Sequence, residues 1–375
     1  MQAMDQALAQ MIERVRAAAA DHTPLRIRGG GTKDFHGRAL HGEVLDTRTL
    51  TGITSYEPSE LVVTARAGTP LAELEAALAD KGQCLPFEPP HFAPGATVGG
   101  MVAAGLSGPA RASVGAVRDY VLGVGLINGR AESLTFGGQV MKNVAGYDVS
   151  RLMAGAWGTL GLLTEVSLKV LPVAPAEATL RFECNQADAL RKLHAWGGQP
   201  LPLNASCWVQ DADAGLGTLY VRLRGAVAAV EAACKAMGGA RLDNATTAPD
   251  WVACRNHTLP WFAARAQQPG LALWRLSLPP TAPVLTLPAA AQPLVEWHGA
   301  LRWVQAPANA GDALRAAAQA MGGSATVFVA ASAHPLSASG QFDPKSAALA
   351  QIHARLKQAF DPAGIFNPGR MAADW

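Results

Sequence analysis

The stretch that decides the fold is residues 94–132, PGATVGGMVAAGLSGPARASVGAVRDYVLGVGLINGRAE. It contains nine glycines in 39 residues and almost no side chain able to do acid–base chemistry. Glycine allows close approach of two backbone segments and lets main-chain N–H groups converge on a ligand. We therefore interpret the stretch as a wall that lies against a large ligand through bare backbone and its N–H groups.

The amino-acid composition limits the classes of protein to which this chain can belong. The 375 residues are 49% hydrophobic and 16% charged, with a formal net charge of +2. This length suggests two domains, and the near-neutral charge does not indicate a nucleic-acid partner. No apolar run reaches the roughly 18 residues needed to span a bilayer, and the N-terminal segment lacks the apolar core of a signal peptide. We expect a cytoplasmic protein that reaches the inner membrane only as part of a complex.

Cysteine spacing predicts that this chain carries no metal site. The five cysteines are odd in number and far apart in sequence: Cys84, Cys184, Cys207, Cys234 and Cys254. No CxxC or other metal-ligand spacing occurs, so neither an iron–sulfur cluster nor a zinc site is expected. A reducing compartment is the default expectation.

A second glycine-rich segment follows a short predicted strand at residues 24–28. Gly29, Gly30 and Gly31 can turn their N–H groups toward one point, and Thr32 and Lys33 add a hydroxyl and a positive charge. This combination suits a pyrophosphate, and a plain flexible turn is the alternative interpretation. The segment is neither a Walker loop nor GxGxxG, so a Rossmann fold is disfavoured and a flavin bound in another fold is the better hypothesis.

The pattern changes after Pro172. Residues 173–335 alternate strands and helices in the manner of an α+β domain, and ACKAMGG at 233–239 echoes AAQAMGG at 317–323. The echo predicts two related strand–helix units in one antiparallel sheet. The remaining tail has one predicted helix at 345–360 and a segment rich in proline and glycine that ends near Arg370.

Five motifs in order carry a family resemblance over essentially the whole chain. They are RIRGGGTKDF, PGATVGGMVAAGLSG, SVGAVRDYVLG, KNVAGYDVSRLMAGAWGTLGLLTEVSLKVLP and FDPAGIFNPGRM. Together they resemble the vanillyl-alcohol-oxidase (PCMH) type of FAD-binding family, and within it the FAD-binding subunits of bacterial glycolate oxidases. The resemblance implies an α+β fold: a PCMH-type FAD-binding domain of two subdomains at 1–172, a ferredoxin-like α+β cap at 173–335, and a segment at 336–375 that returns to the flavin.

The resemblance also implies which residues hold the cofactor. Thr32 occupies the position where relatives with covalent flavin carry a histidine, so FAD is expected to bind non-covalently. The expected FAD contacts are Gly29, Gly30, Gly31, Thr32, Lys33, Pro94, Gly95, Thr97, Val98, Gly99, Gly100, Ala104, Gly105, Ser107, Gly158, Thr159, Gly161, Leu163, Asn367 and Arg370. Trp157 is expected to serve packing.

Catalytic residues depart from the family pattern. Related 2-hydroxyacid dehydrogenases bind a divalent metal through an HxGDGNxH stretch, and the corresponding residues here are 297–304, WHGALRWV, which lack the two-histidine pair. Arg255, in WxxR, matches the arginine that meets the substrate carboxylate, and His334 is a candidate base. We expect neither residue to restore a complete metal-dependent site.

Three functions remain open at this point. The first is an FAD-binding subunit of a glycolate oxidase complex, working with a homologous FAD-containing D subunit and an iron–sulfur F subunit. The second is a self-sufficient FAD-dependent 2-hydroxyacid dehydrogenase that uses Arg255 and His334. The third is a scaffold that has lost flavin, against which the intact glycine loops argue.

Overall fold

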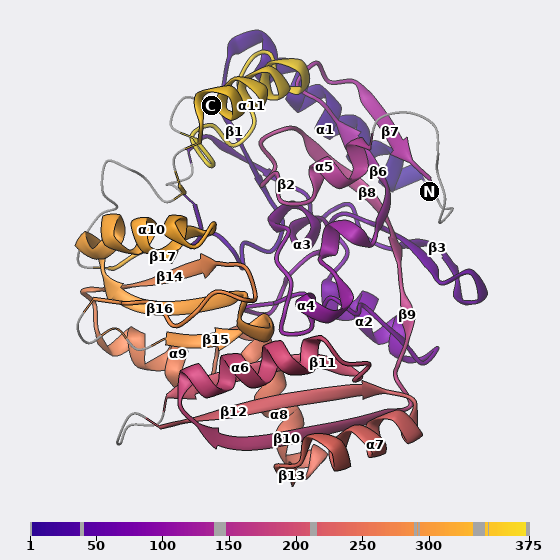
Figure 1. Cartoon of the computed structure of the whole chain (residues 1–375). Helices are drawn as coiled ribbons and strands as arrows, with labels where there is room; N and C mark the ends of the chain where they lie inside the picture. The colour runs from indigo at the N-terminus through magenta and orange to yellow at the C-terminus, as the bar shows by residue number, and fades with distance from the viewer. Residues whose placement is uncertain are drawn as a thin grey trace. The chain divides into compact units, whose positions relative to one another are not determined.

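The computed structural model describes residues 2–37, 41–138, 148–210, 216–288, 291, 293–332, 342–343 and 345–372 (Figure 1). The chain divides into two compact units. The first comprises Met1–Leu106, Ala116–Val173 and Lys345–Trp375, and the second comprises Ser107–Gly115 and Ala174–Pro344. The sequence did not indicate that 107–115 groups with the second unit. The domain boundary predicted at 335 lies outside the described residues.

A five-stranded antiparallel sheet of order β3–β4–β8–β6–β7 forms the centre of the first unit. Its strands are β3 (Ile53–Glu57), β4 (Val62–Arg66), β6 (Val121–Ile127), β7 (Ser133–Gly137) and β8 (Leu162–Lys169), and its helices are α2 (Leu71–Ala79), α3 (Val98–Ala104) and α5 (Val149–Met153). Leu71, Leu74 and Leu78 of α2 are completely buried in one core with residues of this sheet. The short elements η1 (Pro58–Glu60), β5 (Gln83–Cys84), η2 (Val117–Asp119) and β9 (Leu171–Pro172) connect these strands and helices.

A smaller subdomain of the same unit joins the N-terminal segment to the C-terminal tail. It contains α1 (Gln2–Asp21), the parallel strands β1 (Leu25–Arg28) and β2 (Glu43–Asp46), and α11 (Ala347–Phe360). Leu25 pairs with Phe366 in an isolated parallel bridge, and both side chains are buried in one core with Val15 and Leu45. The tail therefore forms part of the core beside β1.

A buried ion pair fixes this tail. The Lys357 ammonium donates hydrogen bonds to Asp361 Oδ2 at 2.6 Å, Thr159 O at 2.8 Å and Phe366 O at 3.0 Å. The Asp361 carboxylate in turn accepts from the N–H groups of Ile365 and Phe366. Burial lowers the pKa of Lys357, and Asp361 opposes that shift. Every group in this cluster is satisfied, as a buried charge requires.

The second unit is built on one eight-stranded antiparallel sheet of order β13–β10–β12–β11–β15–β16–β14–β17. The strands are β10 (Ala176–Cys184), β11 (Leu203–Gln210), β12 (Gly217–Gly225), β13 (Ala240–Leu242), β14 (Leu271–Ser277), β15 (Pro293–Glu296), β16 (Leu301–Pro307) and β17 (Ser324–Val329). The helical elements are α4 (Arg111–Val114), α6 (Gln186–Gly197), α7 (Val227–Met237), α8 (Asn244–Asn256), α9 (Pro260–Ala264), η3 (Arg265–Gln267), η4 (Trp297–Gly299), η5 (Ala308–Ala310) and α10 (Gly311–Ala320).

The predicted internal repeat appears in the topology of this sheet. Strands β10 to β13, with α6 and α7, have the spatial order 4–1–3–2 of a ferredoxin-like unit, and β14 to β17 follow the same order. The echoed glycine pairs lie directly before the last strand of each half, after α7 and α10 (Figure 1). The second half has no helix in residues 278–288, the described part of its first connection. The two halves join through the pairing of β11 with β15.

None of the described helices is both long and apolar enough to cross a membrane.

Replacing Asp361 with Ala tests the buried ion pair. The variant leaves the Lys357 ammonium and two backbone N–H groups without their acceptor, so we expect a loss of about 3–5 kcal/mol in the free energy of unfolding. Urea denaturation followed by circular dichroism measures it. The matched control is Glu231→Gln, which removes an exposed ion pair with Arg241 and should leave the midpoint unchanged. An equal, small shift in both variants would contradict the assignment.

Candidate cofactor-binding site

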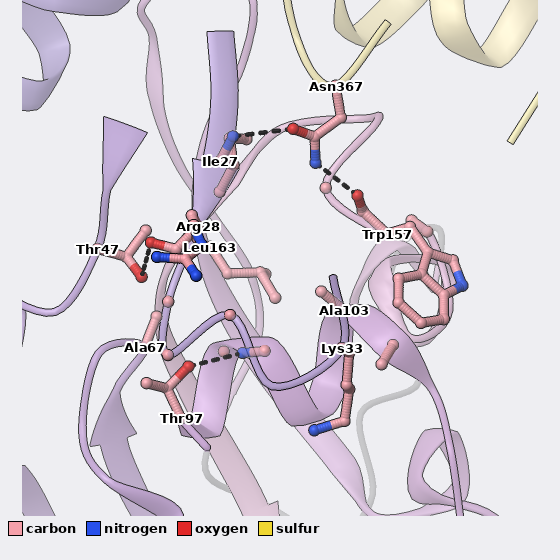
Figure 2. A pocket seen from close by; sticks show the side chains of 18 of the residues that line it. Ile27, Arg28, Lys33, Thr47, Ala67, Thr97, Ala103, Trp157, Leu163 and Asn367 are labelled. Atoms are coloured by element: carbon pink, nitrogen blue, oxygen red, sulfur yellow. Dashed lines mark hydrogen bonds between the residues drawn. The ribbon is translucent and has the colours of Figure 1, made fainter. Parts of the chain in front are cut away.

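A pocket in the first unit lies where the loop after β1, helix α3 and the turn before β8 meet (Figure 2). Its wall is mostly bare backbone and small side chains. The lining residues are Ile27, Arg28, Gly29, Gly30, Gly31, Thr32, Lys33, Asp34, Thr47, Ala67, Thr97, Gly99, Gly100, Ala103, Ala104, Met153, Ala156, Trp157, Gly158, Gly161, Leu163, Asn367 and Arg370.

The loop at residues 29–33 offers a row of unused hydrogen-bond donors. In the described part of the chain, no hydrogen bond involves the main-chain N–H groups of these five residues, whereas the next N–H group, that of Asp34, donates to Gly31 O at 3.1 Å. Gly31 has a left-handed φ of +71°, which turns the chain at this point. Successive N–H groups with no protein acceptor are typical of an anion-binding loop.

Close backbone approach explains why this loop and the segment before α3 need glycine. A Cβ atom on Gly30 would lie 1.7 Å from Gly95 O, and one on Gly99 would lie 2.7 Å from the Ala67 Cβ. Neither position can accept a side chain without moving backbone. The two segments therefore lie against each other and leave one shared hollow.

The N–H groups at the start of α3 are not available to a ligand, contrary to our interpretation of residues 94–132. Val98 N–H donates to Thr69 O at 3.0 Å, and Gly99 N–H donates to Ala67 O at 2.7 Å. The Gly100 N–H donates to Thr97 Oγ1, the helix cap, at 3.2 Å. These N–H groups are already satisfied, so this segment contributes close approach, and the unused donors belong to residues 29–33.

Positive charge predominates around the pocket. Arg28, Lys33 and Arg370 line it together with one carboxylate, that of Asp34. Asp34 accepts from Arg28 Nε at 2.8 Å and is also paired with Arg26. No ion pair in the described part of the chain involves Lys33 or Arg370. The pocket therefore keeps two cations that an anionic ligand can neutralise.

Burial destabilises the charged forms of Lys33 and Arg370 when no anion is bound. It lowers the pKa of Lys33 to about 8 and that of Arg370 to about 10. Arg370 Nη2 donates to Lys33 O at 3.0 Å, and its guanidinium lies 5.1 Å from the Trp157 ring centroid. Its Nη1 is buried and has no hydrogen-bond partner among the described residues. An orphaned guanidinium N–H beside a row of free amides fits a diphosphate group.

Asn367 holds the walls of the pocket in place. Its Oδ1 accepts from Ile27 N–H at 2.8 Å, and its Nδ2 donates to Trp157 O at 2.7 Å (Figure 2). Both side-chain groups are used in this way, so Asn367 positions the pocket through its hydrogen bonds to backbone. A Cβ on Gly158 would lie 2.7 Å from Asn367 Nδ2, which explains that glycine.

Fourteen of the twenty residues predicted to contact the cofactor line this pocket, and six lie outside its lining. Val98 is completely buried in the core, and the Thr159 hydroxyl donates to Ala156 O at 2.7 Å. Gly105 ends α3 and faces the backbone of Gly155. Ser107 belongs to the second unit. The remaining two are Pro94 and Gly95, and the carbonyl oxygen of Gly95 lies against Gly30.

Sequence reasoning missed part of the lining. Ile27, Arg28 and Asp34 flank the predicted loop, and Thr47, Ala67, Ala103, Met153 and Ala156 come from neighbouring segments. Trp157, expected to serve packing, lines the pocket and lies 4.7 Å from the His36 ring, centroid to centroid. Its left-handed φ of +52° beside Gly158 is the sort of turn that the sequence WGTLG indicates.

The predicted catalytic residues do not form a site in the described structure. Arg255 lies half-buried in the last turn of α8, and His334 lies outside the described residues. His298 is enclosed by the hydroxyls of Ser113 and Ser206, at 2.9 and 3.1 Å from its ring nitrogens, and burial lowers its pKa to about 4. Among the described residues, no group of three or more His, Cys, Asp or Glu side chains is arranged to hold a metal ion.

Comparison with known proteins identifies relatives of both the whole chain and its first part. The FAD binding domain family matches residues 6–151. Glycolate oxidase subunit GlcE of Escherichia coli is 46% identical over 364 residues, which cover 97% of each chain. Glycolate oxidase subunit GlcD of Bacillus subtilis is 30% identical over 181 residues, 48% of this chain and 38% of that protein.

A solved structure supports the fold. An alkyldihydroxyacetonephosphate synthase matches with a TM-score of 0.66 and 15% identity, covering 96% of this chain and 75% of that one. At this identity the match concerns the α+β fold alone. The match to the Escherichia coli subunit covers nearly the full length of both chains. The chain therefore belongs to the GlcE family of glycolate oxidase subunits and contains an FAD binding domain.

Proposed function

We propose that this chain is the FAD-binding subunit of a glycolate oxidase complex, which oxidises glycolate to glyoxylate. The observation that carries the proposal is the row of unused N–H groups at residues 29–33 beside Lys33 and Arg370. A dinucleotide presents two phosphates to such a cradle, and the family membership names the dinucleotide.

In this proposal each part of the pocket has one task. The N–H groups of 29–33 and the Lys33 ammonium hold the diphosphate, and Arg370 neutralises it from the tail. Thr97, Gly99 and Ala104 form the part of the pocket wall on which the flavin ring system lies. Asn367 holds β1 and the turn at Trp157 in place through its hydrogen bonds to both. Thr32 stands where a covalent attachment would need a histidine, which favours non-covalent binding. Bound FAD supplies two-electron redox chemistry.

The proposal assigns the main substrate oxidation to a partner. The stretch at 297–304 carries one histidine where the related dehydrogenases have two, and that histidine, His298, is partly buried and hydrogen-bonded to serine hydroxyls. We therefore propose a homologous D subunit as the site of glycolate oxidation. The cysteines of this chain lack cluster spacing, so we propose an iron–sulfur F subunit as the onward electron acceptor and as the route to the membrane surface.

Gly30→Ala tests the cradle. Because its Cβ would meet Gly95 O at 1.7 Å, the two loops must separate, and we expect FAD affinity to fall by at least about tenfold, or 1.4 kcal/mol. The measurement is the FAD content per chain after dialysis, read from the visible absorbance. Gly138→Ala is the matched control, because a Cβ there meets no described residue within 4 Å. Equal FAD content in both variants would contradict the proposed contact.

The pH dependence of FAD binding tests Lys33. Its pKa of about 8 without ligand means that the ammonium is lost as pH rises through 8, and an anion binds the charged form. We expect the FAD dissociation constant to be flat below about pH 7 and to rise above pH 8 by up to about tenfold per unit. Fluorescence titration between pH 6.5 and 9.5 measures this. Lys33→Met should weaken binding and flatten the profile; an unchanged slope would exclude Lys33.

Activity of the isolated chain tests the division of labour. We expect purified protein to contain FAD and to show little glycolate turnover with an artificial electron acceptor, and turnover to appear when D and F subunits are added. The control is the D subunit assayed alone under the same conditions. Full glycolate turnover by the chain alone would instead favour a self-sufficient dehydrogenase, and a preparation that cannot be reconstituted with FAD would exclude both.

A further inference from the structure

Two arginines of the second unit lie against one tryptophan. The guanidinium carbon of Arg111 lies 4.5 Å from the Trp297 ring centroid, and that of Arg275 lies 5.1 Å from it. Arg111 is carried by α4, Arg275 by β14 and Trp297 by η4, so three segments far apart in sequence supply the cluster. All three segments belong to one compact unit.

The backbone around Trp297 is strained in a way that holds this arrangement. Trp297 and His298 both have left-handed φ values, +51° and +55°, which bulky residues rarely adopt. Trp297 Nε1 donates to Gly108 O at 3.0 Å, and the His298 N–H donates to Ser206 Oγ at 2.9 Å. These bonds tie the turn both to the segment that carries Arg111 and to β11. Strained turns of this kind concentrate at functional sites.

Arg275 has no counter-ion of its own. It forms no hydrogen bond and no ion pair within the described part of the chain, and the neighbouring charge of Arg111 opposes its own. The Glu296 carboxylate attracts it, but that carboxylate accepts hydrogen bonds from Cys254 Sγ at 3.0 Å and Trp303 Nε1 at 2.6 Å. Burial together with Arg111 lowers the pKa of Arg275 to about 10.

Two buried arginines of this unit have partners within the described structure. Arg302 donates to the carbonyls of Ala282 and Gly299, and Arg315 pairs with Asp343 at 3.1 Å. Two like charges beside one aromatic ring, with one of them lacking a partner, are stabilised when an anion binds between them. Arg111 is exposed and Arg275 is partly buried, so the arginine side of the cluster meets solvent at Arg111.

We propose that Arg111 and Arg275, whose guanidinium groups both lie against the Trp297 ring, form a binding site for the carboxylate of a small 2-hydroxy or 2-oxo acid. A guanidinium matches a carboxylate with two parallel N–H···O bonds, and the indole supplies an apolar surface for the short carbon chain. That the anion is a 2-hydroxy or 2-oxo acid rests on the proposed function. That an anion binds here rests on the positions of Arg111, Arg275 and Trp297 alone. Arg255, the arginine expected from sequence, is a different residue on α8.

The test is calorimetric titration of the full-length chain with glycolate and with oxalate, at low ionic strength. We expect a dissociation constant of about 1 mM or tighter for oxalate, because its two carboxylates can meet both arginines. Arg275→Gln and Arg111→Gln should each weaken binding at least tenfold. Arg275→Lys keeps the charge but loses the planar fork, so its affinity should lie between those of the wild type and Arg275→Gln.

The matched control is Arg181→Gln, which removes an exposed arginine of the same unit whose partner is Glu183. It should bind oxalate as the wild type does. Wild-type protein that binds neither acid, or glutamine variants that bind like wild type, would overturn the site. Arg111 is exposed, so its variant remains informative if Arg275→Gln fails to fold.

FAD content is read on the same samples by absorbance. Loss of FAD from the wild-type chain would count against the proposed function, whereas carboxylate binding is judged by the titration alone. A chain that holds FAD but binds no carboxylate would leave the cofactor role standing and overturn only the acid site.

Discussion

The cofactor pocket depends on one side chain, Asn367, which connects three distant segments. Its amide accepts from Ile27 at the end of β1 and donates to the carbonyl of Trp157, while its own backbone N–H donates to Leu25 O at 2.9 Å. A buried amide with both ends satisfied tolerates little displacement. The direction in which residues 29–33 leave β1 is therefore set by a residue more than three hundred positions away. The Lys357–Asp361 pair holds the tail that carries it.

Two glycine-rich segments perform different physical tasks. The segment before and within α3 uses glycine for close packing, and its N–H groups are consumed by Thr69, Ala67 and Thr97. The loop at 29–33 uses glycine to turn and leaves its N–H groups unused. The first N–H groups of a helix have no acceptor within the helix, and here residues 67–69 and the Thr97 cap supply the acceptors. The loop lies outside any ladder, so its donors remain available to a ligand.

The second unit combines a regular frame with a strained turn. Two ferredoxin-like halves give a continuous sheet in which β11 and β15 meet, and the turn at 297–299 follows directly after β15. This turn carries Trp297 and a partly buried His298, and Arg111 and Arg275 lie against the tryptophan ring. The chemistry that this arrangement favours is anion recognition.

The sequence by itself determined the cofactor class, the α+β fold, the internal repeat and most of the pocket, because glycine and the residues beside it report local backbone requirements directly. It could not show that the N–H groups of Val98 and Gly99 are occupied, since their acceptors lie on a different segment. It also could not reveal that Trp157 lines the pocket or that Arg111 and Arg275 meet at Trp297. Those facts follow from long-range packing, which brings together side chains whose separation in sequence carries no periodic signal.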